Sequence, residues 1–189
     1  MEFQAAILKQ MPRPEEIDQT TADAWCQNQK DLKRVLAEAL LPKITQSSFK
    51  VRVDYSKTLA EMVMLGNYDT VDESINDNYF PLQGEGQRAV KVALVNLDKT
   101  CSFWGVPKEL KKRGLDLANL EHLLSFGATF PDVQRKFSIF ALGTINILGS
   151  DCLVPYLTSD DGNRELRLIK RDLEGGFWHR DWRVLALCR

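Results

Sequence analysis

The chain has 189 residues, which is enough for one well-filled hydrophobic core with an appended segment. Hydrophobic residues make up 44% of it and charged residues 27%, so wholesale disorder is excluded. The formal net charge is −1, which gives the chain no general attraction to nucleic acid, and we expect no nucleic-acid partner. No apolar run approaches about 18 residues and no signal-peptide pattern is present. We therefore expect no membrane insertion and take the cytoplasm as the default location.

The N-terminal third predicts two helices and a strand. TTADAWCQNQKDLKRVLAEALLP has apolar residues at helical spacing, with Thr20 or Thr21 as N-cap. FKVRVDY alternates apolar and polar residues, as a half-buried strand does. SKTLAEMVMLGNYD predicts a short helix that begins after Ser56 or Thr58 and ends with Gly66 in a left-handed conformation.

The rest of the chain begins with a strand and two helices and ends with strands. RAVKVALVNLD is apolar on both faces, as a central strand is. VPKELKKRG and LDLANLEHLLSFG predict two short helices, which end before Gly114 and Gly127. FSIFALGTINIL, CLVPYL, RELRLI and WRVLALCR predict strands separated by turns. The fold class is therefore α+β, with a C-terminal antiparallel sheet.

The residues that catalysis or metal binding requires are scarce. The four cysteines, Cys26, Cys101, Cys152 and Cys188, are scattered without a C-x-x-C pair, which argues against a zinc site. We expect free thiols, although Cys152 and Cys188 could meet across adjacent strands.

The two histidines do not predict a catalytic triad. His122 lies in a leucine-rich helix, and His179 lies in a predicted turn without a serine or cysteine nearby. GEGQRAV lacks the spacing of a phosphate-binding loop, and SDDGN lacks the ligands of a calcium loop. We therefore expect no enzyme, no catalytic residue, no metal and no cofactor.

The C-terminal segment mixes aromatic and basic residues, which proteins often use to grip partners. Trp178 and Trp182 would either fill the core or contact a ligand. In RELRLIKRD, leucines alternate with Arg167, Ile169 and Arg171, so we expect a chemically mixed outward face.

The same region resembles a known set of proteins. The block RGLDLANLEHLLSFGATFPDVQRKFSIFALGT, followed by VPYL, NRELRL and a terminal W-x-x-x-x-R-V-L-A-L-C-R, is similar to bacterial proteins with the pattern G-L-R-P-A-T-x-x-E-L-L-A-F-G, I-V-A-L-G-S and W-x-x-x-x-R-F-L-A-V-R. That pattern resembles the C-type-lectin-like fold of formylglycine-generating enzymes and of the variable proteins of diversity-generating retroelements. The resemblance covers roughly residues 110 to 189.

The resemblance implies a non-enzymatic binding protein that displays a variable surface on a stable backbone. Error-prone reverse transcription at template adenines turns asparagine codons into many others, but not into those for Lys, Glu, Gln, Met or Trp. The candidate variable, ligand-contacting positions that pass this test are Thr144, Asn146, Arg167, Ile169, Arg171, Phe177, His179, Arg180 and Asp181. The scaffold would be held by inward residues, namely Leu166, Leu168, Trp178, Arg183, Leu185 and Ala186.

We accordingly divide the chain into residues 1–88, an N-terminal helical and small α/β segment, and residues 89–189, a C-type-lectin-like ligand-binding domain. The expected ligand is a macromolecule, with a protein favoured. The amphipathic helix around Trp25 could support a homo-oligomer.

Two alternatives stay open. The chain could be an interaction or regulatory module without diversification, or an oxidase of the formylglycine-generating kind that uses Cys152 and Cys188. The sequence also departs from the set. Its R-P-A-T is replaced by D-L-A-N, so Asp116 is the expected helix cap, and R-G-G-S-W of the enzymes survives only as EGGFW.

Overall fold

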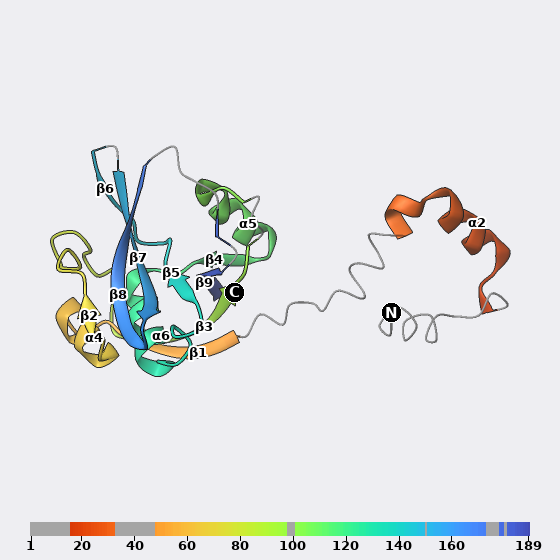
Figure 1. Ribbon diagram of the computed structural model, residues 1–189. Helices are drawn as coiled ribbons and strands as arrows, with labels where there is room; N and C mark the ends of the chain where they lie inside the picture. Colours follow the sequence, from red (N-terminus) through yellow and green to blue (C-terminus); the bar gives the residue numbers. More distant parts are fainter. Residues whose placement is uncertain (1–15, 33–47, 98–100, 150, 173–177, 180) are drawn as a thin grey trace. The chain divides into compact units, whose positions relative to one another are not determined.

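The structure is a computed structural model that describes residues 16–32, 48–97, 101–149, 151–172, 178–179 and 181–189 (Figure 1). The chain divides into two compact units, residues 1–45 and residues 46–189. Among the described residues, no helix is long and apolar enough to cross a membrane.

The first unit contains helix α2 (Gln19–Gln27). Its N-cap is Asp18, whose Oδ1 accepts a hydrogen bond from the Thr21 N–H at 2.9 Å. The prediction of Thr20 or Thr21 as the cap was therefore wrong, because the aspartate carboxylate already occupies that role one turn earlier. None of the α2 residues is buried, and the predicted continuation to residue 41 lies outside the described residues from position 33 onward.

The second unit is built on one nine-stranded sheet. The strands follow the order β1-β3-β9-β5-β7-β8-β2, with β4 paired to β9 and β6 to β7. The pairs β5·β9 and β2·β8 are parallel and the other pairs are antiparallel, so the sheet is mixed. The strands are β1 (Ser48–Asp54), β2 (Thr70–Val71), β3 (Gln87–Val95), β4 (Leu115–Leu117), β5 (Ser138–Phe140), β6 (Asn146–Leu148), β7 (Asp151–Asp160), β8 (Asn163–Asp172) and β9 (Trp182–Cys188).

Helix α4 (Leu59–Gly66) begins with a capping box. Thr58 Oγ1 accepts from the Glu61 N–H at 3.2 Å, and Glu61 Oε2 accepts from the Thr58 N–H at 2.7 Å. Thr58 is thus the cap, one of the two predicted residues. The left-handed residue at the end is Asn67, with φ of 47°, whereas Gly66 was predicted, and asparagine is one of the few residues that tolerate this conformation.

The other helices are η2 (Phe103–Gly105), α5 (Val106–Lys112) and α6 (Leu120–Thr129). The N-cap of α6 is Asn119, so the prediction of Asp116 was wrong; Asp116 lies in β4 and forms an ion pair with Arg189 at 2.7 Å. Helix α6 also continues past Gly127, where it was predicted to stop.

The predicted strand FSIFALGTINIL is interrupted, because β5 and β6 are separate strands on opposite sides of Gly143. A Cβ atom at Gly143 would lie 2.8 Å from the Ala118 carbonyl oxygen, and the Gly143 N–H donates to that same oxygen at 2.9 Å. The chain therefore leaves the sheet here to pass close to the start of α6.

Two apolar clusters fill the second unit. The first joins α4 and α6 to one face of the sheet, with Leu123, Leu124 and Phe126 fully buried. The second joins η2 and α5 to β5, β7 and β9, and contains Phe103, Phe140, Trp178 and Val184. Both faces of the central strands are thus covered, as the apolar sequence of β3 predicted.

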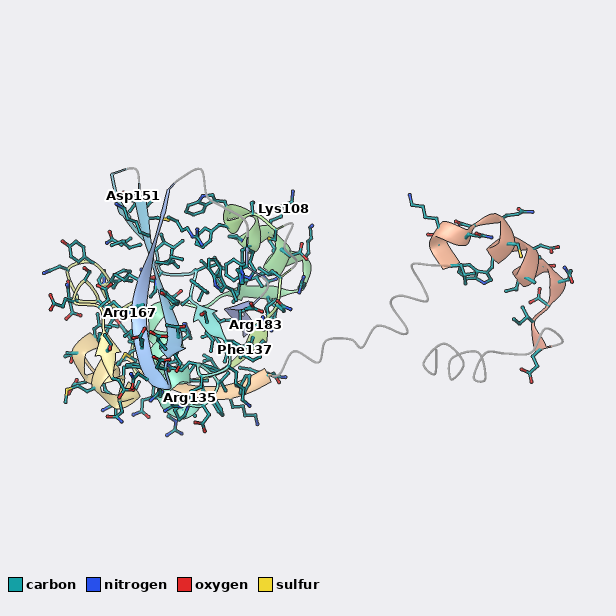
Figure 2. All side chains as sticks on the ribbon, in the orientation of Figure 1. Lys108, Arg135, Phe137, Asp151, Arg167 and Arg183 are labelled. Carbon is teal, nitrogen blue, oxygen red and sulfur yellow. The ribbon has the colours of Figure 1, made fainter. Side chains whose placement is uncertain are left out.

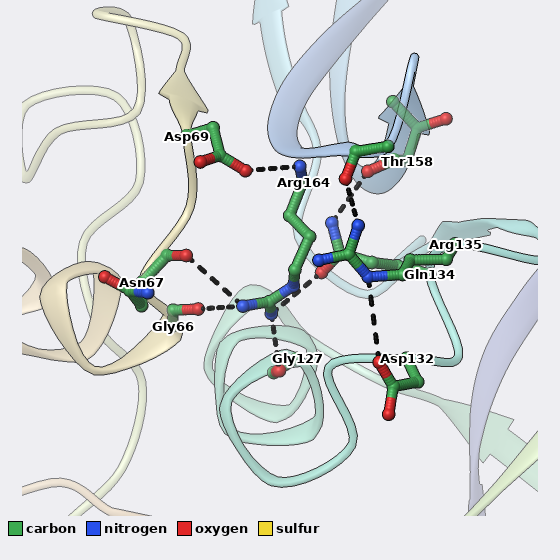
Figure 3. Close-up of polar contacts among 10 residues, drawn as sticks. Gly66, Asn67, Asp69, Gly127, Asp132, Gln134, Arg135, Thr158 and Arg164 are labelled. Carbon is green, nitrogen blue, oxygen red and sulfur yellow. Dashed lines mark hydrogen bonds and ion pairs between the residues drawn. The ribbon is translucent and has the colours of Figure 1, made fainter.

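Arg164 is a buried cation that connects three elements (Figure 3). Its guanidinium donates to the carbonyl oxygens of Gly66 at 2.6 Å and Gly127 at 2.8 Å, which lie near the C-terminal ends of α4 and α6. It also donates to Gln134 Oε1 at 3.1 Å and lies over the Tyr68 ring at 5.1 Å. Because carbonyl oxygens at a helix C-terminus carry partial negative charge, this position suits a cation.

The α+β class is confirmed by these helices and strands. The expected boundary after residue 88 falls inside β3, whereas the structure divides the chain between residues 45 and 46. Pairing explains the difference, since β3 hydrogen-bonds both to β1 and to the C-terminal β9. Residues 48–54 therefore belong to the same sheet as the C-terminal strands.

Candidate functional site

A group of aromatic and basic side chains gathers where η2, β5, β7, β8 and β9 meet. We call it the Trp182 cluster; its members are Phe103, Trp104, Phe140, Tyr156, Arg171, Trp178, His179 and Trp182. These residues come from well-separated parts of the sequence, and the sheet order brings them together.

The inner part of the Trp182 cluster is a rigid aromatic base. Trp178 is 2% exposed, and its backbone N–H donates to the Cys101 carbonyl oxygen at 2.9 Å. Its ring centroid lies 5.4 Å from that of Phe140 and 5.4 Å from that of Trp182, both in edge-to-face geometry. Phe140 in turn stacks on Tyr156 at 4.8 Å. Such pairs stabilise beyond their buried area, so the base holds the outer residues in place.

The outer part of the cluster reaches solvent. Trp104 is 38% exposed, and its ring packs edge to face on buried Phe103 at 5.2 Å. The His179 side chain is 60% exposed and lies 5.9 Å from the Trp182 ring centroid. Arg171 covers Trp182, with its guanidinium carbon 4.9 Å from the ring centroid. Half-buried Trp182 is thus in contact with both a cation and an exposed imidazole.

A polar flank adjoins the cluster on the β7–β8 hairpin. Arg167 donates to both carboxylate oxygens of Glu165, at 3.1 and 3.0 Å, and these hydrogen bonds lower the pKa of Glu165. Arg167 lies opposite Tyr156 in the register. Burial raises the pKa of the Tyr156 hydroxyl, and the positive charge of Arg167 partly opposes that shift. Figure 2 shows Arg167 on this hairpin.

The structure places the nine predicted variable positions in three kinds of environment. Side chains that reach solvent are those of Arg167, His179 and Asp181. Side chains that contact the protein interior or other backbone are those of Thr144, Asn146, Ile169 and Arg171. Phe177 and Arg180 lie outside the described residues.

Two of the candidates that contact the rest of the protein, Thr144 and Asn146, have specific structural partners. Thr144 is 9% exposed, and its hydroxyl accepts from the Leu120 N–H at 3.0 Å, at the start of α6. Asn146 donates from its side-chain amide to the Tyr79 carbonyl oxygen at 2.7 Å. The sequence could not show these contacts, because both partners are distant along the chain.

The outward face expected for Arg167, Ile169 and Arg171 is only partly outward. Alternation in β8 is present, because Leu166 and Leu168 pack on the α6 side and the odd-numbered residues lie on the other. The face of β8 that carries the odd-numbered residues is covered near the C-terminal end of the strand, where Ile169 packs against the second apolar cluster. The prediction of an open mixed face therefore applies to Arg167 but not to Ile169.

The expected scaffold residues are mostly buried. Leu166, Trp178, Leu185 and Ala186 are all at most 2% exposed, as predicted, whereas Leu168 and Arg183 are half-buried. Arg183 lies over the Phe137 ring at 4.2 Å, and Figure 2 shows the two side by side. Burial lowers the pKa of Arg183.

The oxidase alternative depends on Cys152 and Cys188, which lie on strands β7 and β9. None of the four cysteines, all of which lie in the described part of the chain, is joined in a disulfide. Strand β5 separates β7 from β9, so Cys152 and Cys188 do not lie on adjacent strands as the sequence allowed. Across the described part of the chain, no group of three or more His, Cys, Asp or Glu side chains could hold a metal ion.

Sequence reasoning missed Trp104, Phe103 and Tyr156 as members of the cluster. The available signal was the aromatic pair in SFWG directly before a predicted helix, since aromatic side chains contribute much of the buried area in cores and interfaces. The chain matches no protein-family model, no curated protein and no solved structure.

Proposed function

We propose that the protein is a non-enzymatic binding protein whose contact surface is the exposed side of the Trp182 cluster. The observation that supports this most directly is the arrangement of Arg171, Trp182 and His179 on a packed aromatic base. Tryptophan and arginine in such a setting bury much area and make directional contacts with a partner. The preordered rings lose little conformational entropy when a ligand binds.

A protein is the partner class that this surface suits best. The exposed side combines two large rings with a cation, an imidazole and the Asp181 carboxylate. Interfaces between proteins are enriched in aromatic residues and arginine, and polar groups surround them. Because aromatic rings and charged groups lie together on this surface, a protein ligand could make apolar and polar contacts with it at the same time.

The C-type-lectin-like scaffold and its diversification belong to the same proposal. Arg167, His179 and Asp181 are the described candidates that could vary without disturbing packing, because they extend toward solvent. Sequencing the DNA beside the gene tests this form of the proposal. A reverse transcriptase gene and a near-copy of the 3′ coding segment are expected, and their absence would count against diversification.

A fixed interaction module is the second candidate, and a specific observation favours it. Thr144, Asn146, Ile169 and Arg171 all make structural contacts that most substitutions would break. A surface with so many fixed positions is easier to reconcile with one partner than with many. Among close relatives, a fixed module would keep Arg171 and His179 unchanged.

Binding itself is tested with a double variant. Affinity purification with the full chain supplies candidate partners, and each is then titrated as a purified protein by isothermal titration calorimetry. Trp104→Ala combined with His179→Ala removes two exposed side chains and is expected to weaken binding by at least about tenfold. Lys136→Ala, at another exposed position, is the matched control and should bind as the wild type does. Equal affinity of the double variant for every purified partner would refute the proposed surface.

A further inference from the structure

Strand β1 is an edge of the sheet. It pairs with β3 on one side, and no described strand pairs with its other side. The Tyr55 N–H donates to the Gly86 carbonyl oxygen at 2.8 Å, so odd-numbered residues of this ladder direct their backbone polar groups toward β3. The N–H and C=O groups of Lys50 and Arg52 consequently point away from the sheet, ready to pair with another strand.

A groove of about 280 Å³ runs beside this edge. Its apolar walls come from Met62 and Leu65 of α4 and from Leu124 and Ala128 of α6. Arg52, Asp54 and Lys57 also line it, so two of its three charged residues are basic. Leu65 is 59% exposed although it is a large apolar residue. Figure 1 shows α4 and α6 at the same end of the sheet as β1. A strand added to β1 would place every second side chain against these helices.

The even-numbered residues of β1 carry a net positive charge. Lys50 and Arg52 are basic, and the Asp54 carboxylate at the end of the strand already accepts hydrogen bonds from Ser56 and Gln87. Lys50 lies directly opposite Lys91 in the β1–β3 register, and Arg52 is the next residue on the same face of β1. Within the described part of the chain, none of these three side chains forms an ion pair. Two like charges directly opposite each other destabilise a sheet, and carboxylates from a partner would relieve that repulsion.

This charge argues against a second copy as the occupant. Two β1 strands paired edge to edge would bring Lys50 and Arg52 of one chain beside the same residues of the other. Lysines on an edge strand are a known means of preventing such self-association. The same cations attract a segment that carries Asp or Glu at alternate positions.

We propose that the free edge of β1 binds an extended acidic peptide, or an extended acidic segment of another protein, by strand addition. The peptide backbone pairs with Lys50 and Arg52, its apolar side chains enter the groove between β1, α4 and α6, and its carboxylates face Lys50, Arg52 and Lys91. This site is separate from the Trp182 cluster, so it neither requires nor excludes the function proposed above.

The test uses the full chain and a fluorescein-labelled six-residue peptide of alternating valine and glutamate, followed by fluorescence polarisation. Saturable binding is expected, and the same peptide with lysine in place of glutamate should bind at least about tenfold more weakly. Absence of saturable binding by the glutamate peptide up to millimolar protein would overturn the proposal.

Three substitutions examine the three contacts separately. Arg52→Glu reverses the charge, Ala128→Trp fills the groove, and Lys50→Pro removes an outward N–H that β3 does not use. Each is expected to weaken binding of the glutamate peptide by about tenfold or more. Lys108→Glu, a charge reversal on α5, is the control and should leave binding unchanged. If all three edge variants bind as the wild type does, the proposal is wrong.

Two further measurements keep the outcome unambiguous. Circular dichroism checks that each variant is folded. If Lys50→Pro does not fold, the wild-type protein is tested instead with a glutamate peptide whose backbone is N-methylated, because that peptide cannot form the strand hydrogen bonds. The N-methylated peptide should not bind.

Analytical ultracentrifugation of the wild type is expected to show no dimer that depends on β1. A dimer that disappears in Lys50→Pro would assign the edge to a second copy and overturn the peptide proposal.

Discussion

The guanidinium carbon of Arg171 lies 4.9 Å from the centroid of the Trp182 ring and 6.0 Å from that of Phe103. One cation therefore bridges an aromatic residue of β9 and one of η2. Its Nε atom is buried without a hydrogen-bond partner. The ring faces consequently supply much of what holds this side chain in place, and they fix its position at the border of the proposed contact surface.

Replacing Arg171 tests this arrangement without knowledge of a ligand. Arg171→Ala removes both the cation and the packed side-chain stem, and we expect it to lower the free energy of unfolding by about 1–2 kcal/mol in urea denaturation. Lys170→Ala is the neighbouring control. Lys170 is 68% exposed in its ion pair with Asp151, so its loss should change stability by less than about 0.5 kcal/mol. Equal effects of the two variants would contradict the bridging role.

Arg164 should matter more to stability than any exposed cation. Arg164→Met keeps an unbranched apolar stem but leaves the carbonyl oxygens of Gly66 and Gly127 without their buried donor. A buried acceptor left without its donor typically costs about 1–3 kcal/mol, and two such carbonyl oxygens are exposed to that loss, so we expect a loss of about 2–5 kcal/mol here. Arg164→Lys keeps the charge but supplies fewer donors, so its loss should be about half as large. A Met variant within about 1 kcal/mol of the wild type in urea denaturation would refute this account.

The sequence predicted elements well where periodicity alone decides them. The alternation in β1 and β8 and the start of α4 after Thr58 are local patterns, and the structure confirms them. Caps were misassigned where two polar residues competed, as with Asp18 and Thr21. Local propensity cannot decide which of two neighbouring polar residues is the N-cap, because that depends on where the chain enters the helix.

Contacts between residues far apart in the chain could not be predicted from the sequence. The role of Arg164 depends on carbonyl groups 98 and 37 residues away, and its position in NRELRL gave no sign of burial. The same holds for the candidate site, since Phe103 and Trp182 pack in one cluster, with Arg171 over both rings, only because β8, β9 and η2 come together. The sequence indicated which residue types suit a binding surface, and strand order decided which of them came together.

His122 makes stability depend on pH. Its Nδ1 atom accepts a hydrogen bond from the Asn119 N–H at 3.1 Å, which requires the unprotonated nitrogen. Burial lowers the pKa of His122 below its ordinary value of 6.5. As the pH falls below about 6.5, unfolded chains take up a proton that the native state does not, so stability is lost with decreasing pH.

The matched variant for this effect is His122→Gln, because glutamine at the third helical position can accept the same N–H. Urea denaturation at pH 7.5, 6.5 and 5.5 should show the wild type losing stability relative to the variant as the pH decreases. The two proteins should differ least at pH 7.5. Parallel pH profiles would show that His122 does not titrate differently in the folded state.

Gly127 should reverse the usual preference for alanine inside a helix. Alanine normally stabilises a helix interior by about 1 kcal/mol relative to glycine. At Gly127, however, an added Cβ would collide with the Tyr68 hydroxyl and lie 2.8 Å from Leu157 Cδ1. Overpacking of this kind costs about 1–3 kcal/mol, so Gly127→Ala should lower the free energy of unfolding.

A double-mutant cycle separates the collision from helix propensity. In a Tyr68→Leu background the hydroxyl is gone, and Gly127→Ala should then be close to neutral or stabilising by up to about 1 kcal/mol. Ala128→Gly, one residue along the same helix, is the control for propensity and should cost about 1 kcal/mol in both backgrounds. If Gly127→Ala stabilises the wild type, or if Tyr68→Leu does not change its effect, then Tyr68 is not what excludes a side chain at this position.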